Sequence, residues 1–385
     1  KIFLCELSGS DTKITFKEGH AELMHTMNIP SWTKYFLPLS LVITVCAALS
    51  ACKPGGETAE VVISTPILFG TVSDLRALLV SESNDCLYVA DHNQRQIHCV
   101  SLTTHSINEG AAFSTLGKPL AMALARDAAQ LVIATEEPAA VEVIVIATKS
   151  RQSCTFIGTP TSVAVSSNNQ IYVGVGDSPG SIYSCGTVAA PIQSAASIAL
   201  LSGYNRIAGQ NHSGTLMVMV SKDMSLATLW DTESPNNISA QDLFGASATY
   251  GRIVFRPEDR EASVLTDGTA TDGNFLPIYS VDATTRQLTS ITSALQPTFI
   301  PNSLVFLQAP QRAVMTHAAE PVSWATNQDK QTDLHIFDTD TGEELGRYNV
   351  GDYVRKDGLA ADQRNAIYML LGEKQATSVG IVTAP

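Results

Sequence analysis

Residues 79–100, LVSESNDCLYVADHNQRQIHCV, decide the fold, because three short apolar or aromatic runs alternate in them with polar turns. Runs rich in Val, Ile and Tyr that are bounded by Asn, Asp and Ser predict consecutive antiparallel strands. The same unit returns in residues 119–150 and 160–185, at a spacing of about 40 residues. The chain therefore repeats one strand–turn–strand–turn–strand unit.

Longer and more degenerate copies follow in residues 197–221, 251–291, 303–350 and 357–385, which gives about seven units. This repeat length is typical of a four-stranded blade, and blades bury both faces only when they close into a ring. The sequence therefore predicts an all-β fold, a single β-propeller of about seven four-stranded blades over residues 61–385. A two-sheet sandwich array and a β-helix are the alternatives, but sandwiches lack this repeat and β-helix rungs are shorter.

Several segments resemble the YVTN-type β-propeller repeat. Tyr88-Val89-Ala90-Asp91 and Tyr172-Val173-Gly174 are similar to its second strand, and residues 337–342, FDTDTG, are similar to its strand–turn signature. Residues 281–285, VDATT, form a weaker copy. In such turns Asp and Thr side chains bond nearby amides, and Gly supplies the positive φ. The resemblance implies a WD40-like propeller.

The last unit contains three strands at most, so the ring needs a strand from elsewhere. Residues 60–65, EVVIST, have the composition of a good strand at the other end of the repeat region. We expect this segment to supply the outer strand of the last blade, because the pairing covers two sheet edges.

A leader precedes the repeats. Residues 27–51 contain a positive charge at Lys34, an apolar run over 35–48 and then small residues, which is the order of a signal peptide. Leu49, Ser50, Ala51 and Cys52 resemble the lipobox of bacterial lipoproteins. The resemblance implies cleavage before Cys52 and acylation of that cysteine, with palmitate or a similar chain. A buried core helix with an ordinary cysteine is the alternative.

The segments around the leader complete the domain organisation. Residues 1–26 contain four acids, which signal sequences avoid, and are read as an upstream segment or a mis-set start. Residues 52–60 form the lipidated cysteine and a flexible tether. In the lipoproteins that the lipobox resembles, Lys53 favours the outer membrane over the inner membrane. We therefore expect a lipid-anchored protein of the cell envelope, with a monomeric propeller.

Four cysteines remain in the repeat region, an even number in an oxidising compartment. Cys86 and Cys99 fall almost opposite each other on one expected hairpin, which favours a disulfide. Cys154 and Cys185 fall in neighbouring units, on an outer and a third strand, and a second bridge is an option there. Buried free thiols are the alternative for both pairs.

No catalytic motif is present, so no catalytic residue, metal ligand or cofactor is predicted. Residues 267–274, DGTATDGN, have oxygen ligands at calcium-like spacing but lack the distal glutamate of an EF-hand, and a polar loop is the better interpretation. The formal net charge of −13 opposes nucleic-acid binding, because phosphate backbones are repelled.

Long connections in the later units predict the binding face. They are residues 231–250, 267–277 and 317–332, and the candidate contact residues in them are Phe244, Asp267, Asp272, Glu320 and Trp324. Their acids favour a basic partner or a cation. The leading function is a non-catalytic binding or scaffolding module for an envelope protein, a peptide or a glycan. The alternatives are a propeller enzyme, such as a lactonase-like hydrolase or a quinone-dependent dehydrogenase, and an envelope assembly factor.

Overall fold

The computed structural model divides the chain into two compact units, Lys1–Glu60 and Val61–Pro385. The structure describes residues 13–16, 25–28, 62–176, 180–220, 227–234, 238–241, 249–267, 276–282, 287–295, 301–308, 311–317, 333–372 and 375–383. The first unit contains an antiparallel pair, β1 (Lys13–Phe16) and β2 (His25–Asn28), in which Lys13 lies opposite Asn28. The expected leader beyond β2, including Cys52, lies outside the described residues. Among the described residues no helix has the length and hydropathy to cross a membrane.

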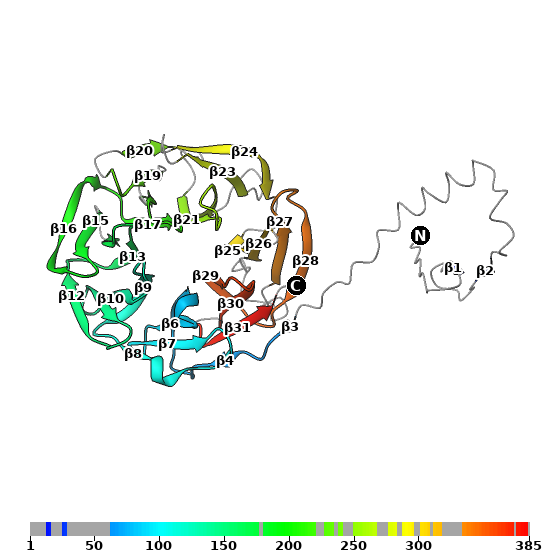
Figure 1. Ribbon diagram of the computed structural model, residues 1–385, viewed down its shortest axis with the longest axis horizontal. Helices are drawn as coiled ribbons and strands as arrows, with labels where there is room; N and C mark the ends of the chain where they lie inside the picture. The colour runs from blue at the N-terminus through cyan, green and yellow to red at the C-terminus, as the bar shows by residue number, and fades with distance from the viewer. Residues whose placement is uncertain are drawn as a thin grey trace, which may run out of the picture. The chain divides into compact units, whose positions relative to one another are not determined.

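The second unit is a ring of antiparallel sheets (Figure 1). Four sheets each have four strands in sequence order. They comprise β5 (Leu75–Ser81), β6 (Cys86–Asp91), β7 (Gln96–Ser101) and β8 (Phe113–Ser114); β17 (Arg206–Gln210), β18 (Leu216–Val220), β19 (Ala227–Asp231) and β20 (Ile238–Gln241); β21 (Thr249–Phe255), β22 (Glu261–Asp267), β23 (Leu276–Asp282) and β24 (Gln287–Leu295); β25 (Pro301–Phe306), β26 (Arg312–His317), β27 (Asp333–Asp338) and β28 (Glu344–Asn349). The helical content of the described ring is limited to two 3-10 turns, Glu82–Asn84 and Glu109–Ala111.

A further sheet has eight strands, because two four-stranded meanders join at their outer edges. The meanders are β9 (Lys118–Leu124), β10 (Gln130–Glu136), β11 (Ala140–Val145) and β12 (Arg151–Thr155), followed by β13 (Pro160–Val165), β14 (Gln170–Val175), β15 (Ser181–Thr187) and β16 (Pro191–Ser202). The junction is one parallel residue pair, Thr155 with Ser194. Each meander therefore keeps the strand order of the other sheets.

The remaining sheet closes the ring. It contains β29 (Val354–Ala361), β30 (Ala366–Leu371) and β31 (Ser378–Thr383), and the start of the second unit adds β3 (Val62–Ile63). Val62 lies opposite Thr383, and a further short strand, β4 (Ile67–Leu68), pairs with Ser378 and Val379. The expected closure by the strand near residues 60–65 is confirmed, although two short strands share the pairing.

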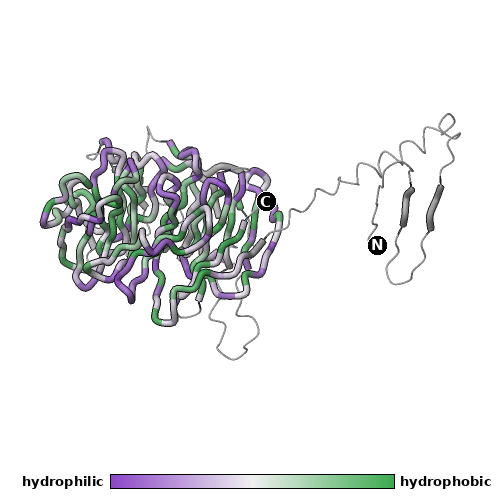
Figure 2. Tube along the Cα trace, turned by 60° about the horizontal axis from the view of Figure 1, so that its bottom comes forward, coloured by the Kyte–Doolittle hydropathy of each residue, from purple (hydrophilic) through white to green (hydrophobic). Residues whose placement is uncertain are grey.

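The core lies between neighbouring sheets. Second strands such as β6, β14 and β30 are buried almost without interruption, because sheets cover both of their faces. One cluster, for example, joins Tyr88 and Ile97 of one sheet to Leu131 and Ile133 of the next. Figure 2 shows hydrophobic stretches inside the ring and hydrophilic turns at its surface. This packing leaves the first strand of each meander at the middle of the ring.

Candidate functional site: a basic mouth of the central channel

The inner strands share one irregularity at the end of the ring where they begin, which we call the mouth end. Each inner strand contains a β-bulge near its start, so at least one residue has no partner on the second strand. The unpaired residues are Arg76 in β5, Leu120 in β9, Thr161 in β13, Ala208 in β17, Gly251 in β21 and Asn302 in β25. Bulges bend the strand and re-aim its side chains.

The largest bulge is in β29. Val354 lies opposite Leu371 and Leu359 lies opposite Met369, so residues 355–358 lack regular partners. This bulge has the sequence Arg355-Lys356-Asp357-Gly358, and Asp357 has a left-handed φ of 57°. Asp tolerates this conformation better than branched residues do. Two cations and one carboxylate are thereby placed at the mouth.

The bulges surround a cavity of about 350 Å³ at the mouth end. Its walls are the starts of inner strands from both halves of the ring. Figure 1 shows inner strands such as β9, β17 and β29 around the middle of the ring. Its cationic lining residues are Arg76, Arg206, Arg252, Arg355 and Lys356. We call these five residues the basic mouth.

Two carboxylates hold the arginines of the basic mouth in place. Asp74, which is only 1% exposed, accepts hydrogen bonds from Arg76 Nε at 2.7 Å and from Arg355 Nη1 at 2.8 Å. Asp357 lies 3.2 Å from Arg206 Nη2 and 3.8 Å from Arg252 Nη1. The four arginines therefore share two carboxylates, in a chain whose net charge is −13.

The cations are recessed rather than fully exposed. The exposed fraction of the side chain is 35% for Arg76, 29% for Arg206, 32% for Arg252 and 23% for Arg355. Burial and the nearby Arg76 lower the pKa of Arg355, while Asp74 opposes both effects. A guanidinium stays charged under these conditions because its ordinary pKa is far above neutrality. The mouth is therefore suited to an anionic group that can enter it.

The channel continues below the mouth as a cavity of about 480 Å³. Arg252 lines both cavities, and the lower one is bordered by apolar side chains such as Leu78, Val254 and Leu304. The inner edges of the inner strands also face this space, and unpaired backbone groups on a sheet edge require water. A hydrated channel favours a hydrophilic ligand over a lipid tail.

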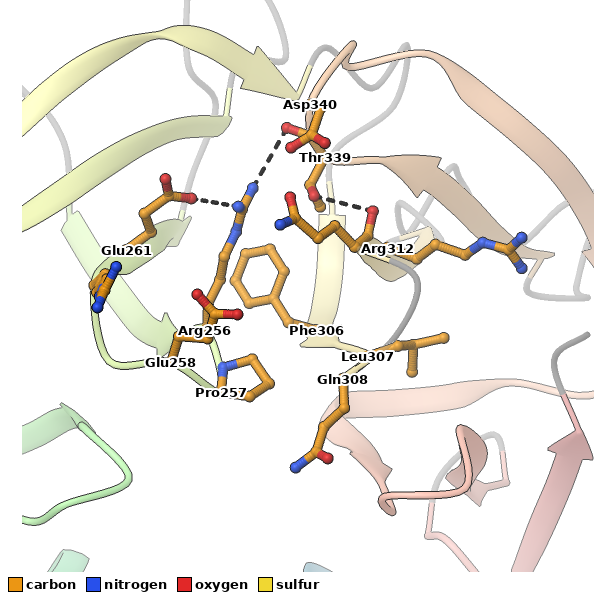
Figure 3. A pocket seen from close by; sticks show the side chains of 12 residues that line it. Arg256, Pro257, Glu258, Glu261, Phe306, Leu307, Gln308, Arg312, Thr339 and Asp340 are labelled. Atoms are coloured by element: carbon orange, nitrogen blue, oxygen red, sulfur yellow. Dashed lines mark hydrogen bonds and ion pairs between the residues drawn. The ribbon is translucent and has the colours of Figure 1, made fainter.

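A groove of about 380 Å³ lies at the opposite end, between the sheets that contain β21 and β25. Figure 3 shows Arg256 at its centre, with Glu261 on one side and Phe306 beneath the guanidinium. Arg256 forms an ion pair with Glu261, donates to the Thr339 carbonyl at 3.4 Å and lies 5.4 Å from the Phe306 ring centre. Because its central charge is neutralised internally, this groove is a weaker candidate.

The structure leaves most of the sequence-predicted binding face undescribed. Phe244, Asp272, Glu320 and Trp324 lie outside the described residues, and Asp267 is the last residue of β22, opposite Thr249. The calcium-like segment after Asp267 is likewise outside them. The strand ends Gln241, Thr249, Asp267, Leu276 and His317 lie at the mouth end, whereas Asp231, where the first connection begins, lies opposite Leu216 at the other end. Within the described residues, no group of three or more His, Cys, Asp or Glu residues is arranged to hold a metal ion.

The basic mouth is a feature that sequence reasoning missed. Its cations are scattered from residue 76 to residue 356, and only ring closure brings them together. One local signal of the basic mouth was present in the sequence. The charged residues RKDG at 355–358 precede the apolar strand at 366–371.

Both cysteine pairs form disulfides in the structure, with Cα atoms 5.5 Å apart for Cys86–Cys99 and 5.8 Å apart for Cys154–Cys185. Cys86 lies opposite Ser101 and Cys99 lies opposite Tyr88, so the first pair is diagonal and not directly opposite. The second bridge joins β12 to β15, across the two meanders of the eight-stranded sheet. Oxidation in exported protein stays a prediction, which alkylation and mass spectrometry test.

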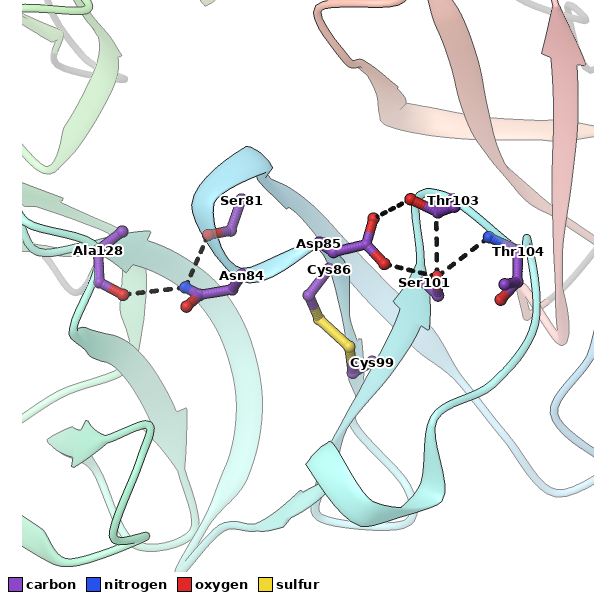
Figure 4. The surroundings of a disulfide bond; sticks show 9 residues. All are labelled: Ser81, Asn84, Asp85, Cys86, Cys99, Ser101, Thr103, Thr104 and Ala128. Atoms are coloured by element: carbon purple, nitrogen blue, oxygen red, sulfur yellow. Dashed lines mark hydrogen bonds between the residues drawn. A yellow bond between two sulfur atoms is a disulfide. The ribbon is translucent and has the colours of Figure 1, made fainter.

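The turn beside the first disulfide is fixed by a carboxylate (Figure 4). Asp85 accepts hydrogen bonds from Thr103 Oγ1 at 2.6 Å and Ser101 Oγ at 2.7 Å, and these bonds lower its pKa. Asn84 Nδ2 donates to the Ala128 carbonyl of the next sheet at 2.9 Å. These groups have structural partners and contribute no free site.

Comparison with solved structures identifies the architecture. The beta-propeller domain of Cps50 (Swd1) from Myceliophteria thermophila has a TM-score of 0.64 at 10% identity, covering 85% of this chain and 100% of that chain. The fold is a β-propeller. Hydrazine synthase from Kuenenia stuttgartiensis has a TM-score of 0.59 at 11% identity, covering 82% of this chain and 96% of that chain. No protein-family model and no curated protein matches the sequence, so these similarities establish the propeller alone.

Proposed function

We propose that this chain is a non-catalytic binding module of the cell envelope, whose propeller takes an anionic group of a protein, peptide or glycan at the basic mouth. The observation that carries the proposal is a set of four recessed arginines that share two carboxylates, in a chain of net charge −13. A cleft lined by one sign of charge attracts the opposite sign from solution. Arginine forks also bind carboxylate or phosphate oxygens in pairs.

The path of the chain supports access to the mouth. β31 runs away from the mouth end, and Val62 lies opposite Thr383, the last residue of that strand. The chain therefore enters the ring at the end opposite the mouth. A lipid on Cys52, in an outer-membrane lipoprotein, would be joined through the tether to the strand that begins at that opposite end.

We also propose that the ring is a YVTN-type propeller of seven four-stranded blades. This count treats the two meanders of the eight-stranded sheet as separate blades. It is supported by the single residue pair that joins them and by the bulge that each inner strand carries near its start. Each meander then contributes one inner strand to the channel.

Binding of a hexaglutamate peptide to the full-length chain tests the mouth, with hexalysine as the opposite-charge control. We expect the double variant Arg206→Gln, Arg252→Gln to weaken hexaglutamate binding about tenfold or more, because each charged hydrogen bond contributes about 1.5–3 kcal/mol. Arg347→Gln is the matched control, since that arginine lies on outer strand β28 and pairs with Asp333. Equal affinity of wild type and the double variant would contradict the proposal.

Replacement of Cys52 by Ser tests the anchor. The variant is expected to lose palmitate labelling and to accumulate as uncleaved precursor or soluble product, because the acylated thiol is absent. Labelling that persists unchanged in Cys52→Ser would show that the lipid lies elsewhere.

A further inference from the structure

Large apolar side chains are exposed at the mouth end of the ring. The described residues include seven exposed large hydrophobic side chains, and four of them are Leu68, Val72, Leu116 and Ile157. Their exposed fractions are 74%, 62%, 47% and 90%, respectively. The other three, Ile192, Leu200 and Leu345, are on outer strands β16 and β28. Exposed apolar side chains at one end of a fold can contribute to an interaction surface.

Strand order explains why these four residues share one end. Leu116 and Ile157 are in the connections from β8 to β9 and from β12 to β13, and Val72 is in the connection from β4 to β5. Each of these connections leads from an outer strand to the start of an inner strand, where the basic mouth opens. Figure 1 shows β4, β8 and β12 following one another along one arc of the ring. We call these four residues the apolar arc.

Hydrogen bonds hold parts of the arc in position. The Val72 carbonyl accepts from Asn93 Nδ2 at 3.1 Å. The Leu116 amide donates to the buried Glu142 carboxylate at 2.7 Å, and Gly117 donates to the same oxygen at 3.4 Å. The backbone is therefore fixed at both positions while the side chains point to solvent. A preformed surface loses little conformational freedom on binding.

We propose that the apolar arc and the basic mouth together dock an acidic polypeptide segment that also carries apolar side chains. This inference rests on the proposed anion site and specifies its partner. Acidic side chains complement the cations, and apolar side chains cover the arc. A flat lipid surface fits less well, because the cations lie recessed in the channel, with Arg355 only 23% exposed. A polypeptide chain can enter the recess.

Two peptides with equal numbers of glutamates test the surface, one with leucines between the glutamates and one with serines. The full-length chain is expected to bind the leucine peptide about tenfold more tightly. The double variant Leu116→Ser, Ile157→Ser should lose this preference and still bind the serine peptide. The matched control Leu200→Ser, Leu345→Ser removes two side chains that are each 48% exposed on outer strands and should keep the preference.

The outcomes separate the surface from the mouth. An unchanged preference in Leu116→Ser, Ile157→Ser overturns the apolar arc even if the mouth binds glutamate. If the serine peptide fails to bind but leucine-peptide binding needs Leu116 and Ile157, the arc stands and the mouth is wrong. Capture of the Cys52→Ser chain by phosphatidylglycerol vesicles, lost in the arc variant, would assign the surface to a membrane and overturn the proposal.

Discussion

The two ends of the propeller use arginine in different ways. At the opposite end, Arg256 is 13% exposed and has its own carboxylate in Glu261, with Phe306 beneath the guanidinium. At the mouth, Arg76 and Arg355 share Asp74, and Arg206 and Arg252 share Asp357. The more buried arginine thus has a carboxylate of its own, and the more exposed arginines of the mouth share one carboxylate between two. We infer that the paired arginine stabilises the fold, and that the arginines that share carboxylates at the mouth can also bind an anionic group.

The largest effect is expected for Asp74, which pairs with two arginines of the mouth. The change Asp74→Asn removes a carboxylate that is 1% exposed and leaves two guanidiniums close together. Loss of one partner of a buried ion pair costs about 3–5 kcal/mol, so urea denaturation should show a large loss of stability. Hexaglutamate binding should become tighter in the same variant, because the mouth gains positive charge.

Asp333→Asn is the control for Asp74. Asp333 pairs with Arg347 on an outer strand, and the Arg347 side chain is 62% exposed, so solvent screens that pair. A loss of stability in Asp333→Asn as large as in Asp74→Asn would remove the distinction between the two pairs.

At the opposite end, Glu261→Gln is expected to have a smaller effect. The Glu261 carboxylate is 30% exposed, so removal of its charge should reduce the free energy of unfolding by about 1 kcal/mol. Hexaglutamate affinity should stay at the wild-type value, because Arg256 is remote from the mouth. Thermal denaturation and peptide titration measure the two effects, and a change in peptide affinity would mean that the ends are coupled.

The smallest effect is expected for Glu142, which supports the apolar arc. Burial raises the pKa of this carboxyl above its ordinary value of 4.5. The folded protein therefore binds the proton more tightly than the unfolded chain does, and stability falls as pH rises from 4.5 through the raised value. Glu142→Gln should flatten this dependence in melting temperatures measured across that range. Glu344→Gln, on exposed β28, should keep it.

The propeller architecture could be predicted because each repeat unit has strands and turns that are recognisable from neighbouring residues alone. Turn residues and β-branched runs recur along residues 79–185, and the strand at residues 60–65 has the composition that closure needs. Cys154 and Cys185 could be placed on an outer and a third strand for the same reason. The register of Cys86 and Cys99 was less accurate, because the turn near Asn93 shifts the pairing by two residues.

The site could not be predicted because its chemistry depends on bulges and on closure. A single unpaired residue such as Arg76 leaves almost no trace in a hydrophobic pattern, yet it turns a side chain towards the channel. Arg76 and Arg355 are 279 positions apart and meet only where the first and last sheets join. Charge counted over the whole chain also conceals a local excess of the opposite sign.

The bulges at the inner-strand starts have a consequence for how specificity can evolve. Residues in the regular strands must fit the packed interfaces between sheets, so substitutions there are costly. A bulged residue has no cross-strand partner, and Arg76, Leu120 and Thr161 already differ in chemistry at equivalent positions. The rim of the channel can therefore acquire new recognition chemistry one position at a time, while selection for stability acts on the rest of the ring.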